Sequence, residues 1–102
     1  MDGNPADRLR RLLSERRAEI LALARRHGAY DVCLFGSVAR GDASGSSDVD
    51  LLVTFEADRS LLDQVGLQQD LADLLGVPVD VVSRGGLSPY IRADVLREAV
   101  PV

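Results

Sequence analysis

Tryptophan and lysine are absent from the sequence, cysteine occurs once, and the aromatic residues are limited to two tyrosines and two phenylalanines. The single cysteine, Cys33, excludes an internal disulfide, and its place in a strand-like run favours burial in the core. No apolar run approaches the roughly 18 residues that a membrane-spanning helix needs, and the first residues are too polar for a signal peptide. These absences predict a cytoplasmic protein with no membrane part.

Charge is acidic overall, with a formal net charge of −4, and it is unevenly distributed. Residues 1–28 hold seven arginines against four acidic residues, whereas the remainder holds five arginines against twelve. Nucleic-acid binders usually combine a basic surface with aromatic side chains for base stacking, so direct nucleic-acid binding is not expected. We interpret the basic N-terminal segment as a solvated helix face, with contact to an acidic partner or a triphosphate as the alternative.

The 102 residues, 46% of them hydrophobic, predict a single domain spanning residues 1–102. Helical and strand-like segments alternate without an internal repeat, and this order predicts an α/β fold, a small mixed β-sheet with helices packed on it. The expected helices are Pro5 to Gly28, a short turn after Ser37, Ser60 to Leu75 and Ser88 to Ala99; the expected strands are Tyr30 to Phe35, Asp48 to Phe55 and Val77 to Ser83.

Within the second long helix, the spacing of apolar residues predicts that Leu62, Val65, Ala72 and Leu75 face inward. The only histidine, His27, falls in the last turn of the first helix, where stabilising the helix C-terminus is favoured over catalysis. The loop at 41–47 is polar and rich in glycine and serine, and we expect it to move when a ligand binds.

Two aspartates, Asp48 and Asp50, open the segment DVDLLVTF, although aspartate is depleted in strands. Side chains two positions apart on a strand point the same way, with Cα atoms roughly 6.5 to 7 Å apart, so both carboxylates can converge on one cation or two adjacent ones. Mg²⁺ prefers oxygen ligands and completes its shell with waters and substrate phosphates. The alternative is a pair of solvated aspartates at the start of a strand.

A Gly-Ser turn, Gly36 and Ser37, precedes this pair, with ten residues between Ser37 and Asp48. It lies between a strand-like run and a short helix-compatible stretch, where exposed N–H groups and the Ser37 hydroxyl can hold phosphate oxygens. Ser37 can also serve simply as the helix cap, which is compatible with phosphate binding. The turn matches neither the Walker pattern nor the dinucleotide fingerprint.

A third carboxylate, Asp80, interrupts the apolar run VPVDVVS. Alternation places Val79 and Val81 on the core face and Asp80 on the opposite face. It is the candidate third ligand of a two-metal phosphoryl-transfer site, and an edge-strand aspartate facing water is the alternative. Arg40, on the short helix after Ser37, is either a triphosphate contact or a surface arginine.

These motifs resemble the minimal nucleotidyltransferases of the DNA polymerase β superfamily: Gly-Ser, a spacer, Asp-x-Asp and a later aspartate, here Gly36, Ser37, Asp48, Asp50 and Asp80. More narrowly, FGSVARGDASGSSDVDLLV and VDVVSRGGLSPYIRADVLREAV are similar to the MNT-type antitoxins encoded beside HEPN-domain toxins. The resemblance covers nearly the whole chain, and the motif shows no departure from the family pattern.

The resemblance implies an enzyme that uses two Mg²⁺ ions and ATP to transfer AMP to a HEPN-type toxin, with tyrosine as the accepting residue, and so neutralises it. Two alternatives remain open at this point. The chain could bind nucleotide and neutralise its partner by contact alone, or it could transfer a nucleotide to a small molecule or an RNA end.

Overall fold

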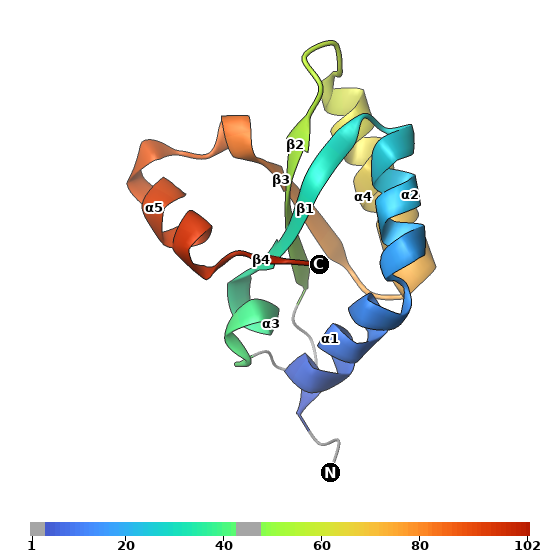
Figure 1. Ribbon diagram of the computed structural model, residues 1–102, viewed down its shortest axis with the longest axis vertical. Helices are drawn as coiled ribbons and strands as arrows, with labels where there is room; N and C mark the ends of the chain where they lie inside the picture. Colours follow the sequence, from blue (N-terminus) through green and yellow to red (C-terminus); the bar gives the residue numbers. More distant parts are fainter. Residues whose placement is uncertain (1–3, 43–47) are drawn as a thin grey trace.

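The computed structural model describes residues 4–42 and 48–102, so most of the loop at 41–47 lies outside the described residues. Among the described residues, four strands form one mixed sheet in the order β3-β2-β1-β4 (Figure 1). β1 pairs antiparallel with both β2 and β4, and β2 pairs parallel with β3. The elements, in chain order, are α1 (Pro5–Glu15), α2 (Arg17–Arg26), β1 (Ala29–Phe35), α3 (Gly36–Arg40), β2 (Val49–Phe55), α4 (Leu61–Leu75), β3 (Val79–Ser83), η1 (Arg84–Gly86), α5 (Pro89–Glu98) and β4 (Val100–Pro101). The expected mixed sheet with packed helices is confirmed.

The two faces of the sheet carry cores of different size. On one face, α1, α2 and α4 cover a large cluster that includes Leu34, Leu51 and Val81. On the other, η1 and α5 cover a small cluster centred on Leu52. Figure 1 shows the same arrangement, with α2 and α4 on one side of the strands and α5 standing off the other. Side chains alternate along a strand, so the residues between those of the large cluster point to the opposite face. That opposite face, where the small cluster lies, is the thinly covered face of the sheet.

The predicted helix over Pro5 to Gly28 is two helices, which corrects the expectation of one. Arg16, with φ −103° and ψ 13°, separates α1 from α2. α1 packs against α3, whereas α2 packs against β1 and α4. A straight helix could not cover both surfaces, so packing requires the change of direction at Arg16. The helical periodicity of the segment does not reveal this change.

The inward face of α4 also differs from the prediction. Leu75 is buried as predicted and Ala72 is partly buried against the large cluster, but Leu62 and Val65 are 81% and 44% exposed. Leu67 and Leu71 are the other buried residues of this helix. Two glutamines explain the rotation, as each bonds the outer edge of β3. Gln64 Nε2 donates to the Val81 carbonyl at 2.7 Å, and Gln68 Oε1 accepts from the Val81 N–H at 2.9 Å. These bonds satisfy an edge strand that would otherwise expose unpaired backbone groups, so the polar side chains occupy part of the face turned to the sheet.

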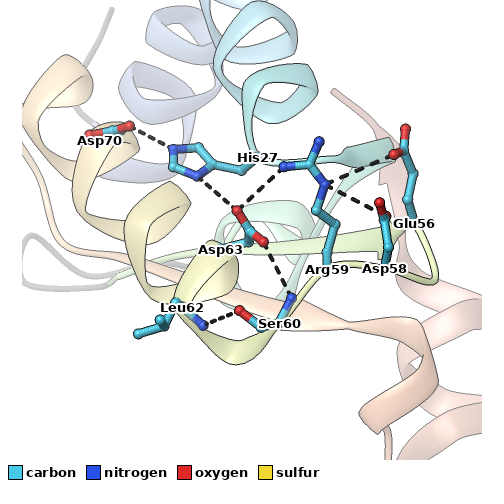
Figure 2. A network of polar contacts seen from close by, with 8 residues as sticks. All are labelled: His27, Glu56, Asp58, Arg59, Ser60, Leu62, Asp63 and Asp70. Atoms are coloured by element: carbon cyan, nitrogen blue, oxygen red, sulfur yellow. Dashed lines mark hydrogen bonds and ion pairs between the residues drawn. The ribbon is translucent and has the colours of Figure 1, made fainter.

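His27 caps the C-terminus of α2 and connects that helix to α4 (Figure 2). Its Nε2 lies 2.8 Å from Asp70 Oδ2, and its Nδ1 lies 3.8 Å from Asp63 Oδ1. Asp63 also completes the capping box of α4 with Ser60 and lies 3.5 Å from Arg59 Nη1. These contacts join α2, the β2–α4 loop and α4, and they agree with the structural role expected for the histidine.

Two further expectations have outcomes in the fold. Cys33 is half-buried rather than fully buried, and its Sγ lies 3.1 Å from Arg84 Nη2. In the described residues, no helix is both long enough and apolar enough to cross a membrane.

Candidate functional site

The turn from β1 into α3 requires a glycine for two separate reasons. Gly36 has φ 79°, a backbone conformation that residues with a Cβ rarely adopt. A Cβ placed there would lie 2.3 Å from Asp50 Oδ2. The glycine of the predicted Gly-Ser turn therefore lies directly against one aspartate of the Asp-x-Asp pair.

Ser37 lies within the first turn of α3 and is not its cap. The N-cap residue is Phe35, whose extended backbone leads into the helix without a side-chain capping bond. The interpretation of Ser37 as a simple cap is therefore wrong. Gly41, with φ 82°, ends the helix, and its N–H donates to the Ser37 carbonyl at 3.0 Å.

The sheet register brings the second and third aspartates together. In the parallel pair β2 and β3, Asp50 is in register with Asp80, and across the antiparallel pair it faces Phe35, the residue before Gly36. Val79 and Val81 are buried and Asp80 is exposed, as alternation predicted. Neighbouring strands lie about 4.8 Å apart, so this register makes Asp50 and Asp80 adjacent on the thinly covered face.

Asp48 is exposed and directly precedes β2. Its charge acts on Asp50, whose pKa is raised from 3.8 to about 6. Burial is the main cause, followed by the negative charges of Asp80 and Asp48, while Arg40 partly offsets them. The three predicted carboxylates therefore form one electrostatically coupled group in which negative charge is undercompensated.

The donor set suits a hard divalent cation, since all three side chains offer carboxylate oxygens and the mutual repulsion at Asp50 is what a cation would relieve. Across residues 4–42 and 48–102, however, no three His, Cys, Asp or Glu side chains are already gathered as a metal cluster. The residue types suit Mg²⁺, but among the described residues their side chains are not gathered into a metal-binding cluster.

Arg40 extends from α3 and is shared between two acids. Its Nε lies 3.2 Å from Asp42 Oδ2, and its Nη1 lies 3.2 Å and 3.3 Å from the two carboxylate oxygens of Glu98. The hydrogen bonds that Arg40 donates to Asp42 and then to Glu98 raise the pKa of Arg40, which keeps its positive charge beside the aspartates. Asp42 is exposed apart from this ion pair.

Glu98 was missed by the sequence reasoning. It is the last residue of α5, and its Oε1 accepts a hydrogen bond from the Gly36 N–H at 2.7 Å. Sixty-two positions separate the two residues, and no spacing rule connects a helix end to a distant glycine turn. Only the packing of α5 over the sheet brings them together.

A cavity of about 240 Å³ lies apart from these residues, between α1 and the C-terminal strand. The Arg17 Nε beside it donates to the Val102 carbonyl at 2.8 Å. The cavity is lined by Arg10, Leu13, Ser14, Arg17, Leu34, Val100, Pro101 and Val102. None of the predicted site residues lines it, so this cavity is separate from the candidate site.

Comparison with known proteins adds an independent observation. Residues 17–102 match the nucleotidyltransferase domain family. The chain is 45% identical to protein adenylyltransferase MntA of Thermococcus cleftensis over 80 residues, which cover 78% of this chain and 81% of the relative. A solved structure described as a minimal nucleotidyltransferase is 56% identical, with a TM-score of 0.79, and the match covers 88% of this chain and 92% of the other. A toxin–antitoxin crystal structure with AMP-PNP is 26% identical, with a TM-score of 0.71, and the match covers 82% of this chain and 69% of the other.

Proposed function

The chain belongs to the nucleotidyltransferase domain family and is a nucleotidyltransferase, and we propose that it transfers AMP from ATP to a tyrosine hydroxyl of a HEPN-type toxin. In the reaction, the acceptor oxygen forms a bond to the α-phosphorus of ATP, the bond to the β-phosphate oxygen breaks, and pyrophosphate leaves. The modified toxin would be inactive, so the chain would act as an antitoxin in the cytoplasm.

One observation carries the proposal: the glycine of the Gly-Ser turn touches Asp50, and Asp50 is in register with Asp80. The Gly-Ser turn and a carboxylate pair are thus adjacent, although 44 positions along the chain separate Gly36 from Asp80. The sheet holds both on one face, where only the small cluster under α5 covers the strands. Phosphoryl transfer needs such a meeting of anion-binding donors and metal-binding acids.

We assign Asp48, Asp50 and Asp80 as the residues that would hold Mg²⁺. When bound, magnesium neutralises the charge that develops on the phosphate oxygens during transfer. Asp80, whose side chain is exposed, would meet the hydroxyl of an incoming acceptor. The half-buried Asp50 is held at the base of the site against Gly36, which keeps its carboxylate in position.

Gly36 and Ser37 would bind the β- and γ-phosphates through backbone N–H groups and the Ser37 hydroxyl. Arg40 would add a positively charged contact to the triphosphate, and its exposed position beside Asp50 suits that role. Specific binding of a tyrosine would need a surface that this small face does not offer by itself, so the toxin would supply part of the acceptor site.

The proposal of a toxin as acceptor is supported by what the relatives are named. The Thermococcus cleftensis relative is a protein adenylyltransferase, and the 26% identical structural relative is a toxin–antitoxin complex with a nucleotide analogue. The same relatives also support ATP as the nucleotide donor.

Intact mass spectrometry tests this function directly. The protein encoded beside this chain is incubated with it, Mg²⁺ and ATP, and its mass should increase in whole AMP units. Asp48→Asn should abolish the increase, whereas Asp73→Asn, at an exposed position on α4, makes the same chemical change away from the site and should preserve it.

An unmodified partner that is nevertheless inhibited would refute AMP transfer and leave neutralisation by contact. Modification of a small molecule or an RNA end without any partner protein would refute the toxin as acceptor.

A further inference from the structure

The two donors that the proposed function assigns to the triphosphate share an anion that the chain itself supplies, the carboxylate of Glu98. The Gly36 N–H donates to Glu98 Oε1 at 2.7 Å, and Arg40 Nη1 lies within 3.3 Å of both oxygens of the same carboxylate. A carboxylate held by one backbone N–H and one guanidinium has the surroundings that a phosphate oxygen finds in a binding turn.

Charge argues against a phosphate and this carboxylate occupying the place together. Glu98 faces a group that already contains Asp48, Asp50 and Asp80, and its own charge is among the causes that raise the pKa of Asp50. A triphosphate brings further negative charge to the same donors. Two anions competing for one guanidinium and one N–H repel each other, and the more highly charged one gains more from the contact.

The structure allows the Glu98 side chain to leave without unfolding its surroundings. The C-terminal end of α5 is held by Val95, which packs in the cluster with Leu52, and by β4, which pairs with β1. Neither contact depends on the Glu98 carboxylate, whose side chain is 27% exposed. Rotation of one side chain is enough to free both donors.

We propose that Glu98 is an internal competitor of the nucleotide: its carboxylate occupies the place of a triphosphate oxygen at Gly36 and Arg40, and ATP must displace it. The inference rests on the proposed function, since it assumes that ATP binds at this turn. Glu98 thereby lowers the affinity of the chain for ATP.

Calorimetric titration with Mg²⁺ and AMP-PNP tests the competition without requiring AMP transfer. Glu98→Gln keeps an acceptor for the Gly36 N–H but removes one of the two negative charges that pair with Arg40, whereas Glu98→Ala removes both the acceptor and that charge. We expect AMP-PNP to bind roughly threefold more tightly to Glu98→Gln and roughly tenfold more tightly to Glu98→Ala than to the wild-type chain. Asp94→Asn, an exposed acid that pairs with Arg97 on the same helix, is the charge-matched control and should bind like the wild type.

A structural role for Glu98 would give the opposite order. If the carboxylate only holds the turn in shape, both Glu98 variants should bind AMP-PNP more weakly, with alanine the weaker of the two, and this result would overturn the inference. Equal affinity in all four proteins would also overturn it while leaving the proposed function intact. Failure of every protein, the wild type included, to bind AMP-PNP would refute the proposed function and the inference together.

Thermal unfolding without nucleotide separates affinity from stability. Glu98→Ala loses a hydrogen bond to the Gly36 N–H, so its melting temperature should fall even as its affinity for AMP-PNP rises. An increase in affinity that merely followed an increase in melting temperature would contradict competition at the turn. If Glu98→Ala does not fold, Glu98→Gln still decides between the two directions.

Discussion

Replacing Gly36 by alanine tests whether the turn is built around Asp50. The new Cβ would lie 2.3 Å from Asp50 Oδ2, 3.1 Å from its Cγ and 3.3 Å from its Cβ. Because the closest atom is the end of a rotatable side chain, the carboxylate should turn away rather than break the sheet. The alanine must also adopt φ 79°.

The magnitudes follow from these two effects. The positive φ costs about 1 kcal/mol after allowing for the reduced freedom of the unfolded chain, and forcing Asp50 from its position adds about 1 kcal/mol. We therefore expect Gly36→Ala to lower the free energy of unfolding by about 2 kcal/mol. The rate of AMP transfer should fall about 100-fold, because a displacement of about 1 Å at a reacting group has that effect.

Gly41→Ala is the matched control. Gly41 has φ 82°, and a Cβ there would meet no atom of the described residues within 4 Å, so the substitution carries only the backbone cost of about 1 kcal/mol. Urea unfolding measures the stability of both variants, and mass spectrometry of the proposed acceptor protein measures the rate of AMP transfer under conditions where both are folded. Equal losses of stability and of transfer rate in the two variants would refute the contact between the turn and Asp50 as the reason for glycine.

Three further predictions concern charge, packing and backbone strain. Because the pKa of Asp50 is about 6 in the fold and 3.8 ordinarily, protonation stabilises the fold below about pH 4 and this contribution is lost as pH rises through 6. In metal-free buffer, Asp50→Asn should thus be about 1 kcal/mol more stable than the wild type at about pH 7, after allowance for partial exposure. Urea unfolding measures the difference, and the same difference at about pH 4 would contradict this explanation. Leu71→Ala should cost about 2 to 5 kcal/mol in urea unfolding and Leu62→Ala no more than about 0.5, since only Leu71 is buried, and equal costs would contradict the orientation of α4. Asp31→Gly should raise the free energy of unfolding by about 0.5 to 1 kcal/mol, because Asp31 holds φ 52° at an irregular point of β1. A loss of stability would show that the Asp31 side chain stabilises the fold by more than the positive φ destabilises it.

The candidate site was predictable because its residue types carry local signals. Gly36, Ser37, Asp48 and Asp50 lie within one short segment, and Asp80 interrupts an apolar strand. The alternation that placed Asp80 opposite the buried valines follows from strand geometry alone, and the structure confirms it. Their roles in binding Mg²⁺ and phosphate stay predictions.

Sequence periodicity was less informative for the helices. It identified α4 and the inward positions of Ala72 and Leu75, but not those nearer the start of the helix. There the positions turned to β3 are held by Gln64 and Gln68, which bond an edge strand and carry no apolar signal. It also continued the first helix through Arg16, where only the separate surfaces covered by α1 and α2 require the change of direction.

The sequence by itself determined which chemical groups this protein can use: a Gly-Ser turn, three acids and the alternating pattern of a small mixed sheet. The tertiary structure alone decided which of these groups touch. It placed Asp50 against Gly36 and in register with Asp80, and it brought Glu98 from the end of α5 to the same turn. The physical reason is that periodicity and turn signals arise from neighbours along the chain, whereas register and helix packing depend on contacts between distant segments that exist only when the core is formed.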